Sequence, residues 1–446
     1  MITLQERVHG APHPPSWSVG KLHRVLRSRK NLKNAGMQED NLLSLSYGRI
    51  IRKDIDAAEG LLPESFETYQ IVKPGNIVMR LTDLQNDKRS LRQGLVLERG
   101  IITSAYDALE VGSEHDPRFW AYSLLALDLA KYYYSLGGGV RQSINFSDFP
   151  NDWIGVPESN IQIDIADFLD HETTHVNHLI DKKKQQIAKL DEEFRAFMSL
   201  AVTGGIYDGK TRPSPHVWLS SVPEHWTVSR LKVVCSRIVD CLHETPEHSE
   251  SGEYPSIRTA DVESGRILIE TAKRVSELEY TRRIQRLEPI AGDVVYTREG
   301  ERFGIAALIP DNKKLCLGQR MMMFRTNRRI RPAYLMWSLN GEFAYQYLKQ
   351  STAGATSPHL NIFDIRNVPI LLPPLAEQDE IVSKIDLRAR KQWALSEAIG
   401  SSIERLNEFR SSLITAAVTG QIDMAAWQKQ GSTARRLDAI EVEVTS

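Results

Sequence analysis

One long segment of the chain occurs twice. Residues 157–206 and residues 373–422 match without a gap, and every shared position is separated by 216 residues. Both copies carry the letters AVTG near their ends, and Gln162 and Gln378 occupy the same place in each copy. A repeat with so long a period indicates duplicated structural units. Any fold of this chain must therefore hold the segment in two equivalent settings.

The repeated segment has the apolar spacing of a long helix. Apolar residues in the first copy recur at intervals of four and three, with Lys183 the one misfit, and Pro and Gly are absent from residue 161 to residue 203. The pattern predicts a helix of about 35 residues, about 50 Å long, that ends at Gly204, and the second copy would end at Gly420. The residues predicted to form the seam are Leu169, Val176, Ile180, Ile187, Leu190, Phe194 and Phe197 in the first copy and Ile385, Ile399, Ile403, Leu406 and Leu413 in the second.

Helices of this length gain most of their stability from packing rather than from intrinsic propensity. We therefore expect the two copies to pack along each other. The alternative is a pair of unrelated surface helices on separate domains, and the matched register argues against it.

A second repeat marks the start of two similar domains. Residues 17–22 (WSVGKL) and residues 226–231 (WTVSRL) are related by a shift of 209. In each domain a turn leads into a short apolar strand, at residues 73–79 and 291–296. Helices are predicted over residues 117–136 and 332–349, both with Pro in the first turn. The sequence offset between the two domains is 209 residues at their starts and 216 residues at the long repeated segments. The domains therefore share a scaffold and differ by insertions within it.

Composition places the chain among globular proteins. It has 446 residues, 41% of them hydrophobic and 25% charged, which is enough for two or three domains. No apolar run is long enough to span a membrane, and the first residues lack a signal-peptide core. Cys235, Cys241 and Cys316 have no metal-ligand spacing, so a reducing cytoplasm fits best. The net charge of −1 does not by itself predict a nucleic-acid partner.

Residues 204–211 (GGIYDGKT) fit the phosphate-binding P-loop pattern letter by letter. That site needs a strand before the loop and a helix after it, so that backbone amides face the phosphates. Here a long helix is predicted before the loop, and Pro213 and Pro215 follow it. We therefore interpret the segment as a linker after a capped helix.

Residues 171–175 (HETTH) match the zinc motif of two histidines and a general base. A catalytic zinc site needs a third ligand and an open position. Glu192 and Glu193 lie about 25 Å further along the same predicted helix, so they cannot converge on His171 and His175. A zinc-dependent hydrolase that uses His171, Glu172 and His175 is the alternative function, and a solvated polar face is favoured over it.

Four motifs make the chain resemble the specificity subunit of type I restriction–modification enzymes. They are residues 168–173 (FLDHET), 179–187 (LIDKKKQQI), 372–378 (LPPLAEQ) and the stretch from 408–410 (EFR) to 417–420 (AVTG). The order of two domains and two spacer helices covers nearly the whole chain. One departure is VPES at residues 156–159, where the family usually has a proline pair; we expect it to alter only the entry into the helix.

The resemblance implies an α/β (α+β) architecture with an internal pseudo-twofold repeat. Two target-recognition domains would be separated by two long antiparallel coiled-coil helices. Each domain would read one half of a bipartite, asymmetric site on double-stranded DNA. The helices would set the spacing of the half-sites and dock two methyltransferase subunits. S-adenosylmethionine, ATP and Mg would be bound by those subunits and by separate restriction (motor) subunits, so this chain would be non-catalytic, hold no cofactor or metal, and reside in the cytoplasm.

The expected boundaries follow the repeats. Residues 1–156 and 207–372 would form the recognition domains, residues 157–206 and 373–423 the spacer helices, and residues 424–446 a polar tail. Loops after the last helix of each domain and basic residues near strand ends are the expected DNA contacts. These are Arg80, Lys88, Arg89, Arg141, Gln142 and Ser143 in the first domain and Arg298, Arg320, Thr356, Ser357 and His359 in the second. A structural scaffold without affinity for DNA is a further alternative.

Overall fold

The computed structural model of the chain describes residues 2–29, 32–55, 63, 65–84, 91–136, 143–300, 302–351 and 360–424. The chain divides into two compact units: unit 1 comprises residues 1–184 and 398–446, and unit 2 comprises residues 185–397. The expected polar tail lies outside the described residues, except for Met424. No helix in the described ranges is both long enough and apolar enough to cross a membrane.

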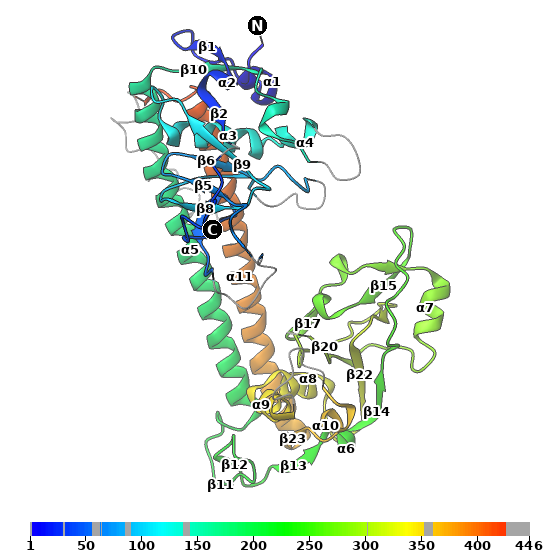
Figure 1. Ribbon diagram of the computed structural model, residues 1–446. Helices are drawn as coiled ribbons and strands as arrows, with labels where there is room; N and C mark the ends of the chain where they lie inside the picture. The colour runs from blue at the N-terminus through cyan, green and yellow to red at the C-terminus, as the bar shows by residue number, and fades with distance from the viewer. Residues whose placement is uncertain are drawn as a thin grey trace. The chain divides into compact units, whose positions relative to one another are not determined.

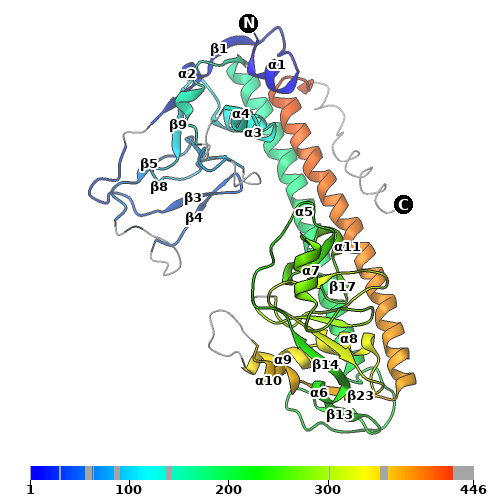
Figure 2. The same ribbon diagram turned by 90° about the vertical axis from the view of Figure 1, so that its right-hand side faces the viewer.

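The two repeated segments form the longest helices. Helix α5 spans Ser159–Val202 and helix α11 spans Leu375–Val418, each of 44 residues. Their first and last residues differ by the same 216 positions, so the sequence repeat predicts equivalent helix ends (Figures 1 and 2). Each helix ends before a glycine in the left-handed region, Gly204 at φ 81° and Gly420 at φ 72°.

Unit 1 is built on a four-stranded antiparallel sheet in the order β2-β9-β6-β7. The strands are β2 Leu26–Ser28, β6 Ile77–Met79, β7 Gln93–Leu95 and β9 Asp107–Val111. One face of the sheet packs Ile77 and Leu109 against helix α3 Pro117–Leu129 and helix α4 Tyr132–Leu136. The other face packs Val78 and Ala108 against smaller strands, so the sheet is covered on both sides.

The remaining elements of unit 1 are short. Strand β1 Ser18–Lys21 pairs with β10 Trp153–Val156, which joins the start of the domain to the residues just before α5. The covering strands are the hairpin of β3 Leu43–Ser46 and β4 Arg49–Arg52, and the pair of β5 Gln70–Val72 and β8 Gly100–Ile102. The short helices are α1 Leu4–His9, α2 Leu22–Val25 and the 3-10 helix η1 Phe146–Asp148.

Unit 2 repeats this plan with the sheet order β14-β22-β19-β20. Its strands are β14 Cys235–Asp240, β19 Val294–Thr297, β20 Ala306–Leu308 and β22 Met321–Thr326. Strand β13 Thr227–Arg230 pairs with β23 Pro369–Leu372, as β1 pairs with β10. Helices α8 Pro332–Asn340 and α9 Glu342–Ser351 cover the face that carries Val294 and Phe324.

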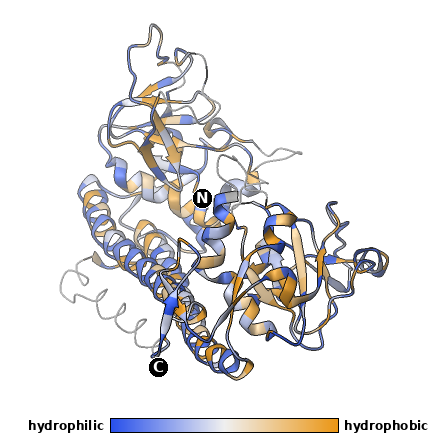
Figure 3. Cartoon of the chain, turned by 90° about the horizontal axis from the view of Figure 1, so that it is seen from below, coloured by the Kyte–Doolittle hydropathy of each residue, from blue (hydrophilic) through white to orange (hydrophobic). Residues whose placement is uncertain are grey.

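The opposite face of this sheet, which carries Val295 and Met323, is covered by a group of short strands and helices. They are β15 Tyr254–Ile257, β16 Val262–Glu263, β17 Arg266–Ile267, β18 Arg274–Val275, β21 Cys316–Leu317, α7 Glu277–Arg283, η2 Thr259–Asp261 and η3 Ile269–Thr271. Unit 2 also contains β11 Thr211–Pro213, β12 Ser221–Pro223, α6 Leu231–Val234 and α10 Ile362–Arg366. In Figure 3 the sheet strands are largely orange, whereas the long helices alternate blue and orange.

Helices α5 and α11 run antiparallel within each unit. In unit 1, Leu169 packs in one cluster with Leu413, and Ile180, further along α5, packs with Leu406, which lies earlier on α11. In unit 2, Asp191 accepts a hydrogen bond from Gln392, and the Arg388 guanidinium lies 3.7 Å from the centre of the Phe197 ring. The mixed helix-and-strand class and the antiparallel helices are therefore confirmed.

Two predicted helices are broken, so this part of the prediction was wrong. Residues 117–136 form α3 and α4 because Lys131 takes the left-handed region, at φ 59°. Residues 332–349 fall in α8 and α9 because Gly341 is extended, with ψ 151°. An extended or left-handed residue cannot continue the hydrogen-bond ladder of a helix.

Candidate nucleic-acid interface

In unit 1 the two predicted contact residues that the structure describes, Arg80 and Ser143, lie near the end of strand β6. Arg80 directly follows β6, and its backbone N–H donates to Arg92 O (2.7 Å). Ile144 N donates to Leu81 O (3.0 Å), which brings the exposed Ser143 beside this strand end. Arg80 and Ser143 therefore share an edge. Lys88, Arg89, Arg141 and Gln142 lie outside the described residues.

The equivalent edge of unit 2 is held together by Arg298. This residue directly follows β19, its backbone N–H donates to Arg320 O (3.0 Å), and its Nε donates to Leu360 O (3.0 Å). Leu360 therefore lies at this edge. Thr356, Ser357 and His359, which precede it in the sequence, lie outside the described ranges.

The two arginines of this edge differ in what they can offer a ligand. Arg298 is only 5% exposed, and its Nη1 lies 2.5 Å from Asp240 Oδ2, at the end of β14. The Arg320 side chain is 55% exposed and pairs loosely with Glu299, at 3.5 Å. Arg298 therefore ties strands together inside the domain, whereas Arg320 presents its charge to solvent.

Sequence reasoning did not select three further polar residues of the same edge. Arg286 donates to Asp240 O (3.0 Å) and to Cys241 O (3.2 Å), and the exposed His243 lies 2.7 Å from Asp240 Oδ2. Arg282 pairs with Glu244 just beyond this strand end. The crowding of arginines at residues 282, 283 and 286 is the sequence signal that could have identified this group.

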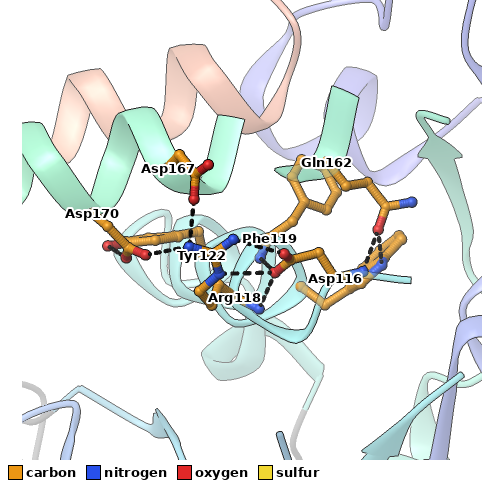
Figure 4. Close-up of polar contacts among 8 residues, drawn as sticks. Asp116, Arg118, Phe119, Tyr122, Gln162, Asp167 and Asp170 are labelled. Carbon is orange, nitrogen blue, oxygen red and sulfur yellow. Dashed lines mark hydrogen bonds and ion pairs between the residues drawn. The ribbon is translucent and has the colours of Figure 1, made fainter. Parts of the chain in front are cut away.

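A buried glutamine fastens the first domain to α5. Gln162 is 1% exposed, and its Oε1 accepts from Asp116 N (3.0 Å) and from Trp120 Nε1 (3.1 Å), as Figure 4 shows. Its Nε2 donates to Pro157 O (2.8 Å). One side chain therefore links the start of α3 to the start of α5.

Gln378 makes the same links in unit 2. Its Oε1 accepts from Arg331 N (2.8 Å), and its Nε2 donates to Pro373 O (2.9 Å) and to Arg329 O (3.2 Å). Arg331 precedes α8 as Asp116 precedes α3. The identity of the two glutamines under the 216 shift was the available signal, although it did not reveal their role.

Matched aspartates on α5 and α11 make the second link. Tyr122 donates its hydroxyl to Asp170 Oδ1 (2.8 Å), and Trp337 Nε1 donates to Asp386 Oδ1 (2.8 Å). Arg118 adds ion pairs to Asp116, Asp167 and Asp170, at 2.9, 2.6 and 2.9 Å (Figure 4). The hydrogen bond from Arg118 to Asp116 is the main reason why the pKa of the Arg118 guanidinium is raised.

The predicted seam residues all lie at least partly out of solvent. Those that are buried are Leu169, Val176, Ile180, Phe194, Ile385, Ile399, Leu406 and Leu413, and those half-buried are Ile187, Leu190, Phe197 and Ile403. Burial of apolar side chains at this spacing is what packed helices require.

The two motifs that suggested catalysis find no support in the geometry. The His171 side chain is 80% exposed and lies 3.2 Å from the buried Glu172, while His175 is exposed. Across the part of the chain that the structure describes, no three His, Cys, Asp or Glu side chains are grouped to hold a metal ion. Residues 211–213, which begin at the last of the P-loop-like letters, form strand β11 rather than a helix.

Comparison with known proteins gives one consistent family. Residues 223–405 match the family described as the type I restriction modification DNA specificity domain. Over 431 residues the chain is 22% identical to the type I restriction enzyme MjaVIII specificity subunit of Methanocaldococcus jannaschii, which covers 94% of this chain and 95% of that protein. It is 23% identical over 263 residues to the EcoKI specificity subunit of Escherichia coli K12, or 56% of this chain and 54% of that one.

A solved structure shares the fold. A chain described as "Structural basis underlying complex assembly and conformational transition of the type I R-M system" aligns with a TM-score of 0.59 at 16% sequence identity. The alignment covers 92% of this chain and 99% of that chain.

Proposed function

Because the chain belongs to the specificity subunits of type I restriction–modification systems, we propose that its two domains read the two halves of a bipartite, asymmetric site on double-stranded DNA. As a specificity subunit it is non-catalytic, and catalysis sits in the partner subunits of the complex. We assign residues 1–156 to the first recognition domain and residues 207–372 to the second.

One observation carries this proposal: both units contain the same sheet order and the same glutamine link to a long helix. A duplicated scaffold supports two reading modules that differ in their edges and share their attachment. The modules are dissimilar, because the second face of the sheet is covered by β15, β16, β17 and β21 in unit 2 but by the β3–β4 hairpin and the β5–β8 pair in unit 1. Two dissimilar modules suit an asymmetric site.

The sheet edges described above are the proposed DNA-reading surfaces. Arg80 and Ser143 in the first domain and the exposed Arg320 in the second are the described residues best placed for this role. Lys88, Arg89, Arg141, Gln142, Thr356, Ser357 and His359 remain predicted contacts. Cationic side chains would position the duplex through phosphates, while amide, hydroxyl and imidazole groups would contact base edges.

Helices α5 and α11 serve, in this proposal, as spacers and as the docking surface for two methyltransferase subunits. Those partners would bind S-adenosylmethionine, and restriction subunits would use ATP and Mg. The complex would act in the cytoplasm. A helix of 44 residues is about 66 Å long at 1.5 Å per residue, which exceeds one turn of duplex DNA, about 34 Å.

Sequencing the adenine methylation of a host with and without this gene tests the proposal. We expect one bipartite methylated motif to disappear with the gene and to return on complementation. A gel shift with methyltransferase subunits separates this function from a scaffold without DNA affinity. Stoichiometric zinc that is lost in His175→Ala, with unchanged methylation, would instead favour the hydrolase.

A further inference from the structure

Unit 1 contains a groove whose lining differs from the matched positions of unit 2. The groove has a volume of about 850 Å³ and lies where the β3–β4 hairpin faces α3, α5 and α11. Leu125, Leu129, Ile180 and Ile414 form apolar walls. The charged residues of the lining are Arg49, Lys184, Arg410 and Asp181, so cations outnumber acids by three to one. All of these residues belong to unit 1.

Arg410 is a partly buried cation to which the described part of the chain offers amide oxygens rather than a carboxylate. Its guanidinium donates to Asn177 Oδ1 and to Asn407 Oδ1, the latter at 2.9 Å. Among the described residues no carboxylate lies within ion-pair distance of it. Burial lowers the pKa of the Arg410 guanidinium, and the charge of Arg49 lowers it further. A charge removed from water without a counter-ion is costly, so an anion in the groove would be stabilising.

The positions of unit 2 that match Arg410 and Asn177 carry different residue types. Phe194 stands where Arg410 stands, and Trp393 stands where Asn177 stands, under the 216 shift. The Phe194 ring is buried and meets the Trp337 ring edge-on, with 5.8 Å between the ring centres. Unit 2 therefore has an aromatic contact at the place where unit 1 has a cation. The repeat predicts the helix position but not the side chain on it.

We propose that this groove receives an acidic segment of one methyltransferase subunit, which presents a carboxylate to Arg410 and Arg49 and an apolar side chain to the walls. The inference rests on the proposed function and specifies its partner. A carboxylate on a flexible side chain can reach a guanidinium set between two helices. Protein–DNA interfaces are more polar than these apolar walls, so the groove suits a protein segment better than duplex DNA.

The test titrates the full chain with the purified methyltransferase subunit of the same system and counts bound copies by analytical ultracentrifugation. The variants are Arg410→Met, which replaces the cation by an apolar chain, and Arg49→Glu, which reverses an exposed charge on the hairpin. Lys182→Glu is the matched control, because Lys182 is an exposed cation of α5 that does not line the groove. Thermal unfolding of Arg49→Glu should equal that of the wild type.

We expect the wild type and Lys182→Glu to bind two copies. Arg410→Met should bind one copy normally and the other about 30-fold more weakly or worse, because the loss of a buried charge pair costs at least this much. Arg49→Glu should weaken the same copy by about tenfold. Two copies bound at wild-type affinity by both variants would overturn the proposal.

Other outcomes are equally decisive. Weaker binding of duplex DNA, with both methyltransferase copies retained, would assign the groove to nucleic acid and would also overturn the proposal. A wild-type chain that binds no methyltransferase subunit would refute the proposed function itself, and the groove assignment with it. The two kinds of failure are therefore distinguishable from the wild-type measurement alone.

Discussion

Unit 1 and unit 2 attach to the long helices in the same way but line them with different side chains. Gln162 and Gln378 each accept the backbone N–H of the residue before a domain helix and donate to the carbonyl of a proline before a long helix. Arg410 and Phe194, which are also equivalent, are in contrast a hydrogen-bonded cation and a packed ring. The attachment is constrained by buried polar geometry, whereas the surface beside it is free to differ.

Loss of the glutamine link should lower stability more than any other substitution compared here. We expect Gln162→Leu and Gln378→Leu each to destabilise its own unit by about 3–5 kcal/mol, because each leaves at least two buried or partly buried polar groups without a partner. Hydrogen exchange of the residues before α3 and α8 measures the two units separately. Gln186→Leu, at an exposed position of α5, is the control and should change little. If only one of the two substitutions destabilised its unit, the two attachments would not be equivalent.

Alanine at the paired helix-ending glycines should have the next largest effect. A Cβ at Gly204 would lie 2.4 Å from Pro223 Cδ, and a Cβ at Gly420 would lie 2.3 Å from Pro14 Cγ. Both glycines also have positive φ, so each substitution should cost about 2–4 kcal/mol in denaturant unfolding. Gly10 has positive φ with open space around it, so Gly10→Ala should cost only about 1 kcal/mol. Equal costs at all three sites would contradict the close packing of the prolines.

Removal of the aromatic hydrogen-bond donors Trp337 and Tyr122 should destabilise the two units to different extents. Trp337→Phe loses a hydrogen bond to Asp386 and buried volume, so we expect a loss of about 2–3 kcal/mol from unit 2. Tyr122→Phe keeps its volume, and Asp170 keeps its ion pair with Arg118, so unit 1 should lose about 1 kcal/mol. Urea unfolding followed by hydrogen exchange measures both losses. The reverse order would mean that the Tyr122 link is the stronger one.

Surface ion pairs should contribute least. The Asp167 carboxylate is 62% exposed and pairs with Arg118, and the Asp379 carboxylate is 55% exposed and pairs with Arg331. Exposed pairs of this kind are screened by solvent, so Asp167→Asn and Asp379→Asn should each change stability by less than about 0.5 kcal/mol. Thermal unfolding at low and high salt checks this expectation. A larger loss at Asp167 would show that the three acids around Arg118 act as one network.

The repeat made the long helices predictable, because an ungapped match must place both copies in equivalent settings. It also located the strands that follow the turns at Gly75 and Gly292, where positive φ needs glycine. The break at Lys131 was not predictable, because a lysine in the left-handed region carries no local signal. Gly341 did carry a local signal, because glycine disfavours the interior of a helix, but the prediction of one continuous helix over residues 332–349 did not take it into account.

The side chains of the candidate site were harder to assign than the fold. Arg298 follows a strand as expected, but only the structure shows that Asp240, 58 residues earlier, takes its charge. Gln162 and Gln378 have a polar residue type that is mostly exposed, so their burial depends on partners that no pattern encodes. Pairings between distant segments therefore set the limit on what the sequence predicts.

The central claim is that two separate modules on one duplicated scaffold read two separate half-sites. Replacing residues 1–156, and in a second chimera residues 207–372, by the domain of another family member tests it, with the methylated motif read by methylation sequencing. We expect each chimera to change one half of the motif, a different half in each case, and to leave the other half intact. A change in both halves, or in neither, would contradict the claim.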